Sequence, residues 1–114
     1  MDYQRSERVG ELLTEVIAEV LREEIRDPRV NAVTITAAKV TKDLRQARIY
    51  FTILGGGAGN KDAVSAGLKS ALGFIRSKIG KRLNLRHVPS IEFLYDESVD
   101  QAERIDKLLK QVKQ

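Results

Sequence analysis

The sequence predicts an α+β domain of two layers, in which a three-stranded mixed sheet carries helices on one face. Apolar residues recur at the three- and four-residue steps of an amphipathic helix in three segments: 6–26, 64–83 and 98–112. Polar and apolar residues alternate, as in half-buried strands, in 33–37 and 46–53. A third short apolar segment spans 91–95. The predicted order is helix, strand, strand, kinked helix pair, strand, helix.

Composition narrows the class of protein. The chain has no cysteine, which excludes disulfides and thiolate chemistry. No apolar run approaches the roughly 20 residues that span a bilayer. The first residues also lack the apolar core of a signal peptide. We therefore expect a cytoplasmic protein with one domain, 1–114, whose core covers 6–110 and whose ends, 1–5 and 111–114, are frayed.

The first predicted helix, 6–26, has both an apolar and an acidic stripe. Ser6 is placed to cap its start, and Asp27 before Pro28 to end it, because the residue before proline avoids the helical conformation. The apolar stripe is Val9, Leu12, Leu13, Val16, Ile17, Val20 and Leu21. The acidic stripe is Glu7, Glu11, Glu15, Glu19 and Glu23. We interpret the acidic stripe as a solvated face; alternatively, it keeps nucleic acid off this side.

Each of the two alternating segments has one apolar and one polar face. The apolar sets are Val33, Ile35 and Ala37 in the first, and Ala47, Ile49, Phe51 and Ile53 in the second. The polar set is Thr34, Thr36, Arg48, Tyr50 and Thr52. The link 41–45 is short enough for a hairpin. Tyr50 is the one candidate on the polar face for stacking with a base, although a surface tyrosine is the ordinary interpretation.

A glycine-rich run, 55–61, separates these strands from the next helix. It resembles a phosphate-binding loop only superficially, because Asn60, Lys61 and Asp62 stand where such a loop needs Gly, Lys and Ser or Thr. We interpret it as a flexible connector. The helical period then runs from Val64 to Leu83 across three glycines, and we expect a break or kink near Gly73 that exposes backbone amides.

The last strand and helix complete the sheet. Because a helical crossover joins 46–53 to 91–95, these two strands are predicted to be parallel. Ser98, with Gln101 three residues later, has the pattern of a capping box that starts the final helix. The apolar side of that helix is Ile105, Leu108, Leu109 and Val112.

Catalysis and metal binding find little support in the sequence. The single histidine, His87, has no serine or carboxylate close in sequence that could orient it, so we interpret it as a loop histidine. No group of His, Cys, Asp or Glu has the spacing of metal ligands. Asp96 and Glu97 precede a helix and interact favourably with its N-terminus. We therefore expect neither enzymatic activity nor a cofactor.

The charge distribution is uneven. From Ala63 to Ile91 the chain has no acidic residue, although its net charge is only +4. This acid-free segment carries six basic residues: Lys69, Arg76, Lys78, Lys81, Arg82 and Arg86. If these residues only solvated the outer surfaces of helices, we would expect acidic residues among them. A polyanion such as RNA is the partner that this segment favours, recognised through its phosphates and shape.

Seven segments, in this order, resemble bacterial ribosome-binding factor A: 24–30, 33–36, 40–44, 47–50, 71–76, 83–86 and 93–98. The resemblance covers about residues 6–110. It implies a type II KH-like fold, in which an Ala-x-Gly kink, here Ala71 to Gly73, replaces the usual Gly-x-x-Gly loop. It also implies a non-enzymatic assembly factor that binds the immature small (30S) ribosomal subunit, assists late 16S rRNA maturation and supports growth in the cold.

On this hypothesis the six basic residues of the acid-free segment bind rRNA around Ala71 and Gly73. Four further candidates have acidic neighbours in sequence: Arg5, Arg8, Lys42 and Arg45. The expected partners are 16S rRNA and the small subunit, with no membrane, no small-molecule substrate and a monomeric protein. Two alternatives stay open: a general KH-like RNA-binding module that acts on other transcripts, and a protein–protein adaptor that uses the first helix.

Overall fold

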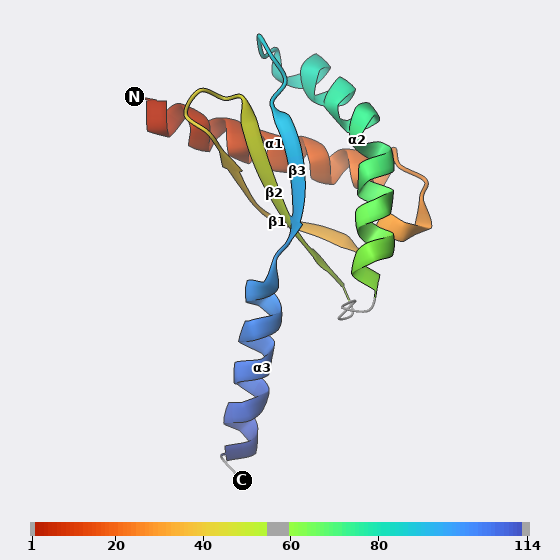
Figure 1. Ribbon diagram of the computed structural model, residues 1–114, viewed down its shortest axis with the longest axis vertical. Coiled ribbons are helices and arrows are strands. Elements are labelled where there is room, and N and C mark those ends of the chain that lie inside the picture. The colour runs from red at the N-terminus through yellow and green to blue at the C-terminus, as the bar shows by residue number, and fades with distance from the viewer. Residues whose placement is uncertain (1, 55–59, 113–114) are drawn as a thin grey trace.

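The computed structural model describes residues 2–54 and 60–112, which form three α-helices, a short 3₁₀ helix and three strands (Figure 1). In chain order these are α1 (Asp2–Glu23), η1 (Pro28–Val30), β1 (Val33–Val40), β2 (Gln46–Ile53), α2 (Lys61–Leu83), β3 (Ser90–Tyr95) and α3 (Glu97–Val112). The predicted α+β class is confirmed. Among the described residues no helix is both long and apolar enough to cross a membrane. Most of the glycine-rich run lies outside the described residues.

The sheet has the order β1-β2-β3, with β1 and β2 antiparallel and β2 and β3 parallel, as predicted. The alternation predicted for β1 holds only to Ile35. A bulge at Thr36 shifts the register, so Ala37 lies opposite Tyr50 on the outer face while Ala38 and Val40 pack against the core. The inward orientation predicted for Ala37 is therefore wrong.

Helices α1 and α2 cover one face of the sheet and enclose the core (Figure 1). Alternation in β2 gives a strictly inward set, Ala47, Ile49, Phe51 and Ile53, each at most 6% exposed. The α1 stripe is buried as predicted except at Leu12, which is 36% exposed. Helix α2 contributes Val64, Leu68, Ala71, Ile75 and Ile79. One apolar layer thus fixes both helices on the sheet.

Helix α1 begins and ends earlier than predicted. It starts at Asp2, so Ser6 lies inside the helix, where it is buried, and is not its cap. The helix ends at Glu23, and Asp27 instead caps η1, where its carboxylate accepts a hydrogen bond of 3.0 Å from the backbone N–H of Arg29. The side chain of Arg29 also binds this carboxylate and, together with the backbone bond, lowers the pKa of Asp27.

Helix α2 is continuous from Lys61 to Leu83 and changes direction near its middle (Figure 1). The predicted helix pair is therefore one bent helix. Because it has no break, the prediction of backbone amides exposed near Gly73 is not supported. Asn84 ends the helix in the left-handed conformation, with φ of 50°.

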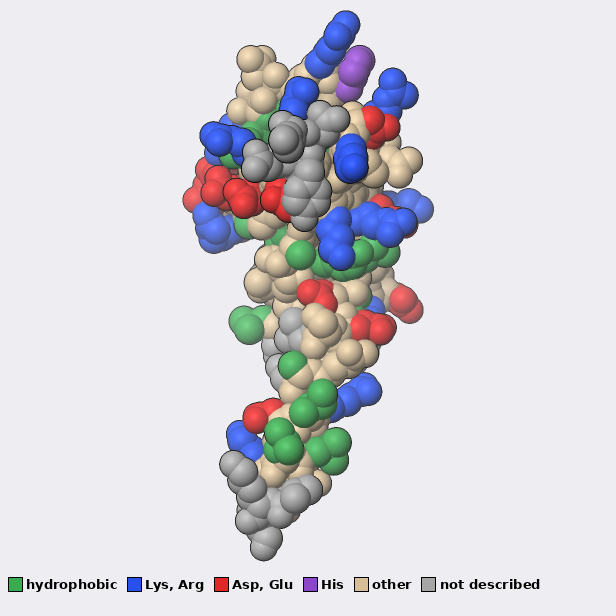
Figure 2. Space-filling model, turned by 90° about the vertical axis from the view of Figure 1, so that its left-hand side faces the viewer, with side chains coloured by type: hydrophobic (Ala, Val, Ile, Leu, Met, Phe, Trp, Pro, Cys, Tyr) green, Lys and Arg blue, Asp and Glu red, His purple; other side chains and the backbone are tan. Residues whose placement is uncertain are grey.

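Helix α3 points away from the two layers (Figure 1). Its cap is Asp96 rather than Ser98, because the Asp96 carboxylate accepts hydrogen bonds from the backbone N–H and the hydroxyl of Ser98, within the first turn. The same carboxylate accepts a 2.6 Å bond from Thr36 at the bulge, which ties the helix start to β1. Along the helix, Ile105, Leu108 and Leu109 remain 57–60% exposed (Figure 2).

Candidate nucleic-acid interface

The acid-free segment forms α2 and the loop that leads to β3. Its six basic side chains do not share one environment. Lys78 and Arg82 lie on the side of α2 that faces α1, Lys69, Arg76 and Lys81 are exposed on the helix, and Arg86 is exposed in the loop. The structure therefore divides the predicted RNA-binding residues into two that form ion pairs with the α1 region and four that are exposed to solvent.

Lys78 and Arg82 are held by glutamates of the α1 region. Lys78 Nζ lies 3.0 Å from a carboxylate oxygen of Glu24, and Arg82 Nη2 lies 2.7 Å from one of Glu19. The hydrogen bond from Arg82, and then its charge, lower the pKa of Glu19; the same contact raises the pKa of Arg82. These two cations join the helices, which leaves them less available to an external phosphate than their sequence positions imply.

We give the name solvent side of α2 to Lys69, Gly73, Phe74, Arg76 and Lys81, which are all exposed. No ion pair is found for Lys69 or Lys81 among the described residues. Arg76 donates a hydrogen bond of 3.1 Å to the carbonyl of Val88 and so fastens the helix to the loop before β3. Lys69, Gly73 and Arg76 follow at steps of four and three, so they share one face of the helix.

Ala71 and Gly73 have opposite surroundings, although both were predicted at the interface. Ala71 is 8% exposed and belongs to the core cluster, so its side chain packs inward. Gly73 is exposed, and a Cβ atom added there would meet nothing within 4 Å. Only Gly73 offers open helix surface, which is room for another chain to approach closely.

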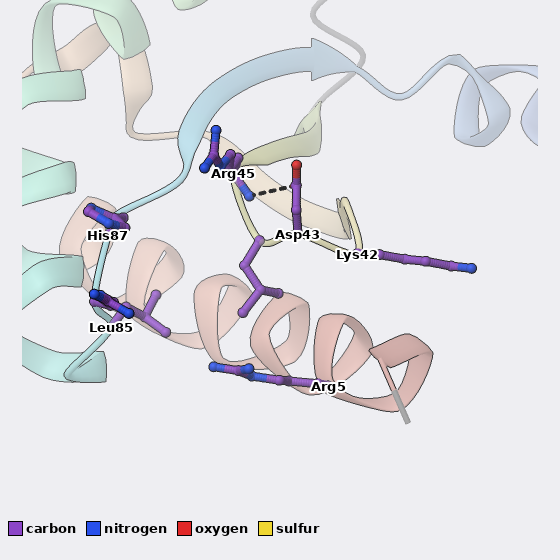
Figure 3. Close-up of a pocket in the computed structure, with 8 residues that line it drawn as sticks. Arg5, Lys42, Asp43, Arg45, Leu85 and His87 are labelled. Atoms are coloured by element: carbon purple, nitrogen blue, oxygen red, sulfur yellow. Dashed lines mark hydrogen bonds between the residues drawn. The ribbon is translucent and has the colours of Figure 1, made fainter.

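The other candidates meet at a groove of about 590 Å³ between the start of α1, the β1–β2 turn and the loop before β3 (Figure 3). We call it the hairpin-end groove; it is lined by Arg5, Lys42, Asp43, Leu44, Arg45, Leu85, Arg86 and His87. Four cationic residues and one acidic residue are therefore among its lining residues. In Figure 3, Arg5 lies along α1 and His87 lies on the loop, while Arg45 and Asp43 point from the turn to the side away from α1 and Lys42 extends away from them all.

The carboxylate in this groove is occupied by the turn itself. Asp43 accepts hydrogen bonds from the Thr41 hydroxyl at 2.6 Å and from the Arg45 backbone N–H at 3.0 Å, and these two bonds lower its pKa. Leu44 takes the left-handed conformation, with φ of 61°, and packs against the core. The acidic neighbour that sequence places beside Lys42 and Arg45 therefore shapes the hairpin, and the groove keeps an excess of positive charge.

Arg8 is exposed on α1 but does not line this groove. Lys and Arg side chains gather around the upper end of the face in Figure 2, with a group of Asp and Glu side chains on the left and others on the right and lower down. No group of three or more His, Cys, Asp or Glu that could hold a metal ion occurs among the described residues. The arrangement suits electrostatic binding of a polyanion through two surfaces, the hairpin-end groove and the solvent side of α2.

Sequence reasoning missed Phe74 as a functional candidate. Tyr50, the stacking candidate from the sequence, is half-buried on the outer sheet face with Lys39 Nζ 5.8 Å from its ring centre. Phe74 is 44% exposed next to Gly73. The helical period contained the signal, because Phe74 falls between the buried positions Ala71 and Ile75 and off their stripe.

Comparison with known proteins places these features in a family. The family model described as ribosome-binding factor A matches residues 5–109. Ribosome-binding factor A of Geotalea uraniireducens is 48% identical over 110 residues, which cover 96% of this chain and 89% of the relative. That of Thermobifida fusca is 43% identical over 114 residues, covering all of this chain and 75% of the relative.

Solved structures share the fold. The crystal structure of ribosome-binding factor A from Thermus thermophilus superposes with a TM-score of 0.69 at 21% identity and covers 79% of this chain and 94% of that one. A homology model of the Thermus thermophilus factor, fitted into a cryo-EM map of its complex with the 30S subunit, gives a TM-score of 0.65 at 22% identity, over 81% of this chain and 96% of that one. At these identities the likeness concerns the architecture alone.

Proposed function

The chain belongs to the ribosome-binding factor A family, and from this premise we propose that it binds the immature small (30S) ribosomal subunit as a non-enzymatic assembly factor in the cytoplasm. There it assists late maturation of 16S rRNA and supports growth in the cold. It acts as a monomer without a cofactor. A relative of the same fold has been fitted into a map of its 30S complex, which makes the subunit the first partner to test.

One observation carries the proposal: Arg5, Lys42, Arg45 and Arg86, from three separate segments of the chain, line the hairpin-end groove. The carboxylate of Asp43 in the same groove is held by the turn, so the lining keeps a net positive charge that attracts a polyanion. An RNA backbone supplies phosphates at regular spacing. The solvent side of α2 adds Lys69 and Lys81, so one RNA segment or two neighbouring ones can be held at both surfaces.

Co-sedimentation tests the choice of partner. The protein should migrate with free small subunits in a sucrose gradient and be absent from translating ribosomes. In a bacterium that lacks its own ribosome-binding factor A, this chain should restore growth and 16S rRNA processing at low temperature. Binding spread over unrelated transcripts would favour the general RNA-binding module. Complexes that survive RNase treatment would favour the adaptor that uses α1.

Charge removal tests the two surfaces. The triple change Arg45→Gln, Lys69→Gln and Lys81→Gln should weaken subunit binding and leave the thermal melt nearly unchanged, since no ion pair is found for these side chains among the described residues. If about five cations contact phosphates of single-stranded RNA, log affinity should fall against log salt with a slope of about −3.5. Each contact removed should reduce that slope by about 0.7.

Lys107→Gln on α3 is the matched control. Its side chain is exposed, lies outside both surfaces and has no ion pair among the described residues, so its removal should leave the slope unchanged. Charge reversal at Lys78 or Arg82 is a poor test, because a new carboxylate there would face Glu24 or Glu19. An affinity independent of salt would contradict the electrostatic account.

A further inference from the structure

Phe74 is an aromatic side chain that the fold leaves outside its core. It is 44% exposed and is absent from both the buried cluster and the residues packed against it. Leu12, Leu54 and three residues of α3 are the other exposed large apolar residues found in the described part of the chain, so Phe74 is the one aromatic among them. Packing in the core therefore does not explain why this position has an aromatic side chain.

The surroundings of the ring are polar and basic. Ser70, Phe74, Ser77 and Lys81 follow at steps of four, three and four, so they share one face of α2, and all four are exposed. A protein partner that docks through apolar contacts usually needs a contiguous patch of several hundred Å². A single ring among serines and a lysine is too small for such a patch but matches one flat base.

The ring is also held in place. Lys78 Nζ lies 5.3 Å from the ring centre, which is cation–π range, and the same amine lies 3.0 Å from the Glu24 carboxylate. Phe74 stands in the interior of a continuous helix, so helical hydrogen bonds on both sides fix its backbone conformation. A base that stacks on a ring already oriented loses less conformational freedom on binding.

Next to the ring, the helix surface is bare. Gly73 has no side chain, and nothing lies within 4 Å of the Cβ position that another residue would occupy. A nucleotide whose base lies on Phe74 therefore has room for its sugar beside Gly73. Lys69 and Lys81 stand on either side along the helix, where they can meet the flanking phosphates. The segment 63–91 contributes no acidic residue that would repel these phosphates, and the Glu24 carboxylate near the ring is paired with Lys78.

We propose that Phe74 is a stacking platform for one unpaired nucleobase of a bound RNA, with Gly73 giving space to the sugar and Lys69 and Lys81 binding the adjacent phosphates. This inference rests on the proposed function for RNA as the ligand, but not on the ribosomal subunit as its source. It adds a base contact to a domain otherwise expected to grip phosphates. Stacking of this kind accepts any base and so favours single-stranded over paired RNA.

The absence of tryptophan from the chain supplies a direct probe. Phe74→Trp places the sole tryptophan at the platform, and Leu12→Trp places it on another helix at a comparably exposed site. Titration with a short oligoadenylate should quench the fluorescence of Phe74→Trp and leave that of Leu12→Trp nearly unchanged. Equal quenching of both, or of neither, would overturn the proposal.

Substitution separates a base from an apolar partner. Phe74→Ala and Phe74→Leu should each weaken binding by about 10- to 100-fold, while Phe74→Tyr stays close to the wild type, because stacking needs a ring. Retained binding in Phe74→Leu would overturn stacking in favour of an apolar contact. If the wild type binds subunits and Phe74→Ala binds equally well, the platform fails and the proposed function stands. If oligoadenylate quenches the fluorescence of Phe74→Trp but the protein does not bind small subunits, the stacking platform stands and the proposed function fails.

Discussion

The two sides of α2 differ in how many of their residues make contacts with the rest of the fold. On the side toward α1, η1 and the sheet, Ile75 is completely buried, Gly67 lies against η1 and Arg82 pairs with a glutamate of α1. On the solvent side, Gly73 has no neighbour within 4 Å of its Cβ position and Phe74 is 44% exposed. Glycine costs up to about 1 kcal/mol in a helix relative to alanine, and at Gly73 no packing gain offsets that cost.

The comparison separates residues that folding needs from residues that binding can use. Both sides carry glycines and cations, so composition cannot tell them apart. The structure does so through contacts: a cation with an intramolecular carboxylate is part of the fold, and one without such a contact is available to a partner. The substitutions below test whether that division is real.

The largest contrast is expected between two adjacent residues. Ile75→Ala should lower the free energy of unfolding by about 2–5 kcal/mol, because it leaves a cavity in the core. Phe74→Ala should lower it by only about 0.5–1 kcal/mol, mainly through the lost contact with Lys78. Urea denaturation of both variants measures the difference. Similar losses would show that Phe74 is a packing residue and that the two sides are alike.

Gly67 should be the next most sensitive position. A Cβ atom there would lie 2.9 Å from Val30 Cγ1 and 3.1 Å from Arg29 Cβ, so Gly67→Ala overpacks the contact with η1. Overpacking costs about 1–3 kcal/mol and better helix propensity returns up to about 1 kcal/mol, so we expect a net loss of up to about 2 kcal/mol by urea denaturation. A gain in stability would show that η1 yields easily and that packing does not require glycine here.

Gly73→Ala should have the opposite sign. With open space at the Cβ position, the free energy of unfolding should rise by up to about 1 kcal/mol, while binding to small subunits weakens because the new methyl group occupies the approach surface. The two glycine variants are each other's controls. A loss of stability in Gly73→Ala would mean that the bend of α2 needs glycine, which would move this residue to the folding side of the comparison.

Much of the fold could be predicted because the pattern of buried and exposed residues within each helix or strand is visible in its own sequence. Strand β2 was predicted with its observed bounds, and its parallel pairing with β3 followed from the helical crossover. The helix caps were wrong, since Ser6 and Ser98 have suitable side chains but lie inside helices that begin earlier. The bulge at Thr36 was missed, and the side chain at this bulge bonds to Asp96, sixty residues away in the chain. Local patterns carry no information about such contacts.

The site was predictable in charge but not in arrangement. The acid-free segment is visible in the sequence, yet the carboxylate that binds Arg82 lies 63 positions earlier, on α1. The hairpin-end groove likewise joins Arg5, Arg45 and Arg86 only through the topology. Sequence separation therefore explains why the candidates could be named while their division into paired and available cations could not.

The smallest expected effect concerns the Glu19–Arg82 pair and its dependence on pH. Arg82 lowers the pKa of Glu19 below its ordinary value of 4.5, so the contact stabilises the folded state above that pH and is lost as the pH falls through the lowered pKa. In Arg82→Gln the pKa of Glu19 should return toward 4.5. The wild type should therefore be slightly more stable than the variant at neutral pH, and the two stabilities should converge in acid.

Urea denaturation across the acid range measures this convergence, with Lys81→Gln as the control. Lys81 is one residue away, exposed, and has no ion pair among the described residues, so its variant should stay parallel to the wild type at every pH. A constant gap between Arg82→Gln and the wild type would mean that Arg82 stabilises by packing of its stem rather than by its charge. Convergence also in Lys81→Gln would erase the distinction between the two cations, since both would then be part of the fold.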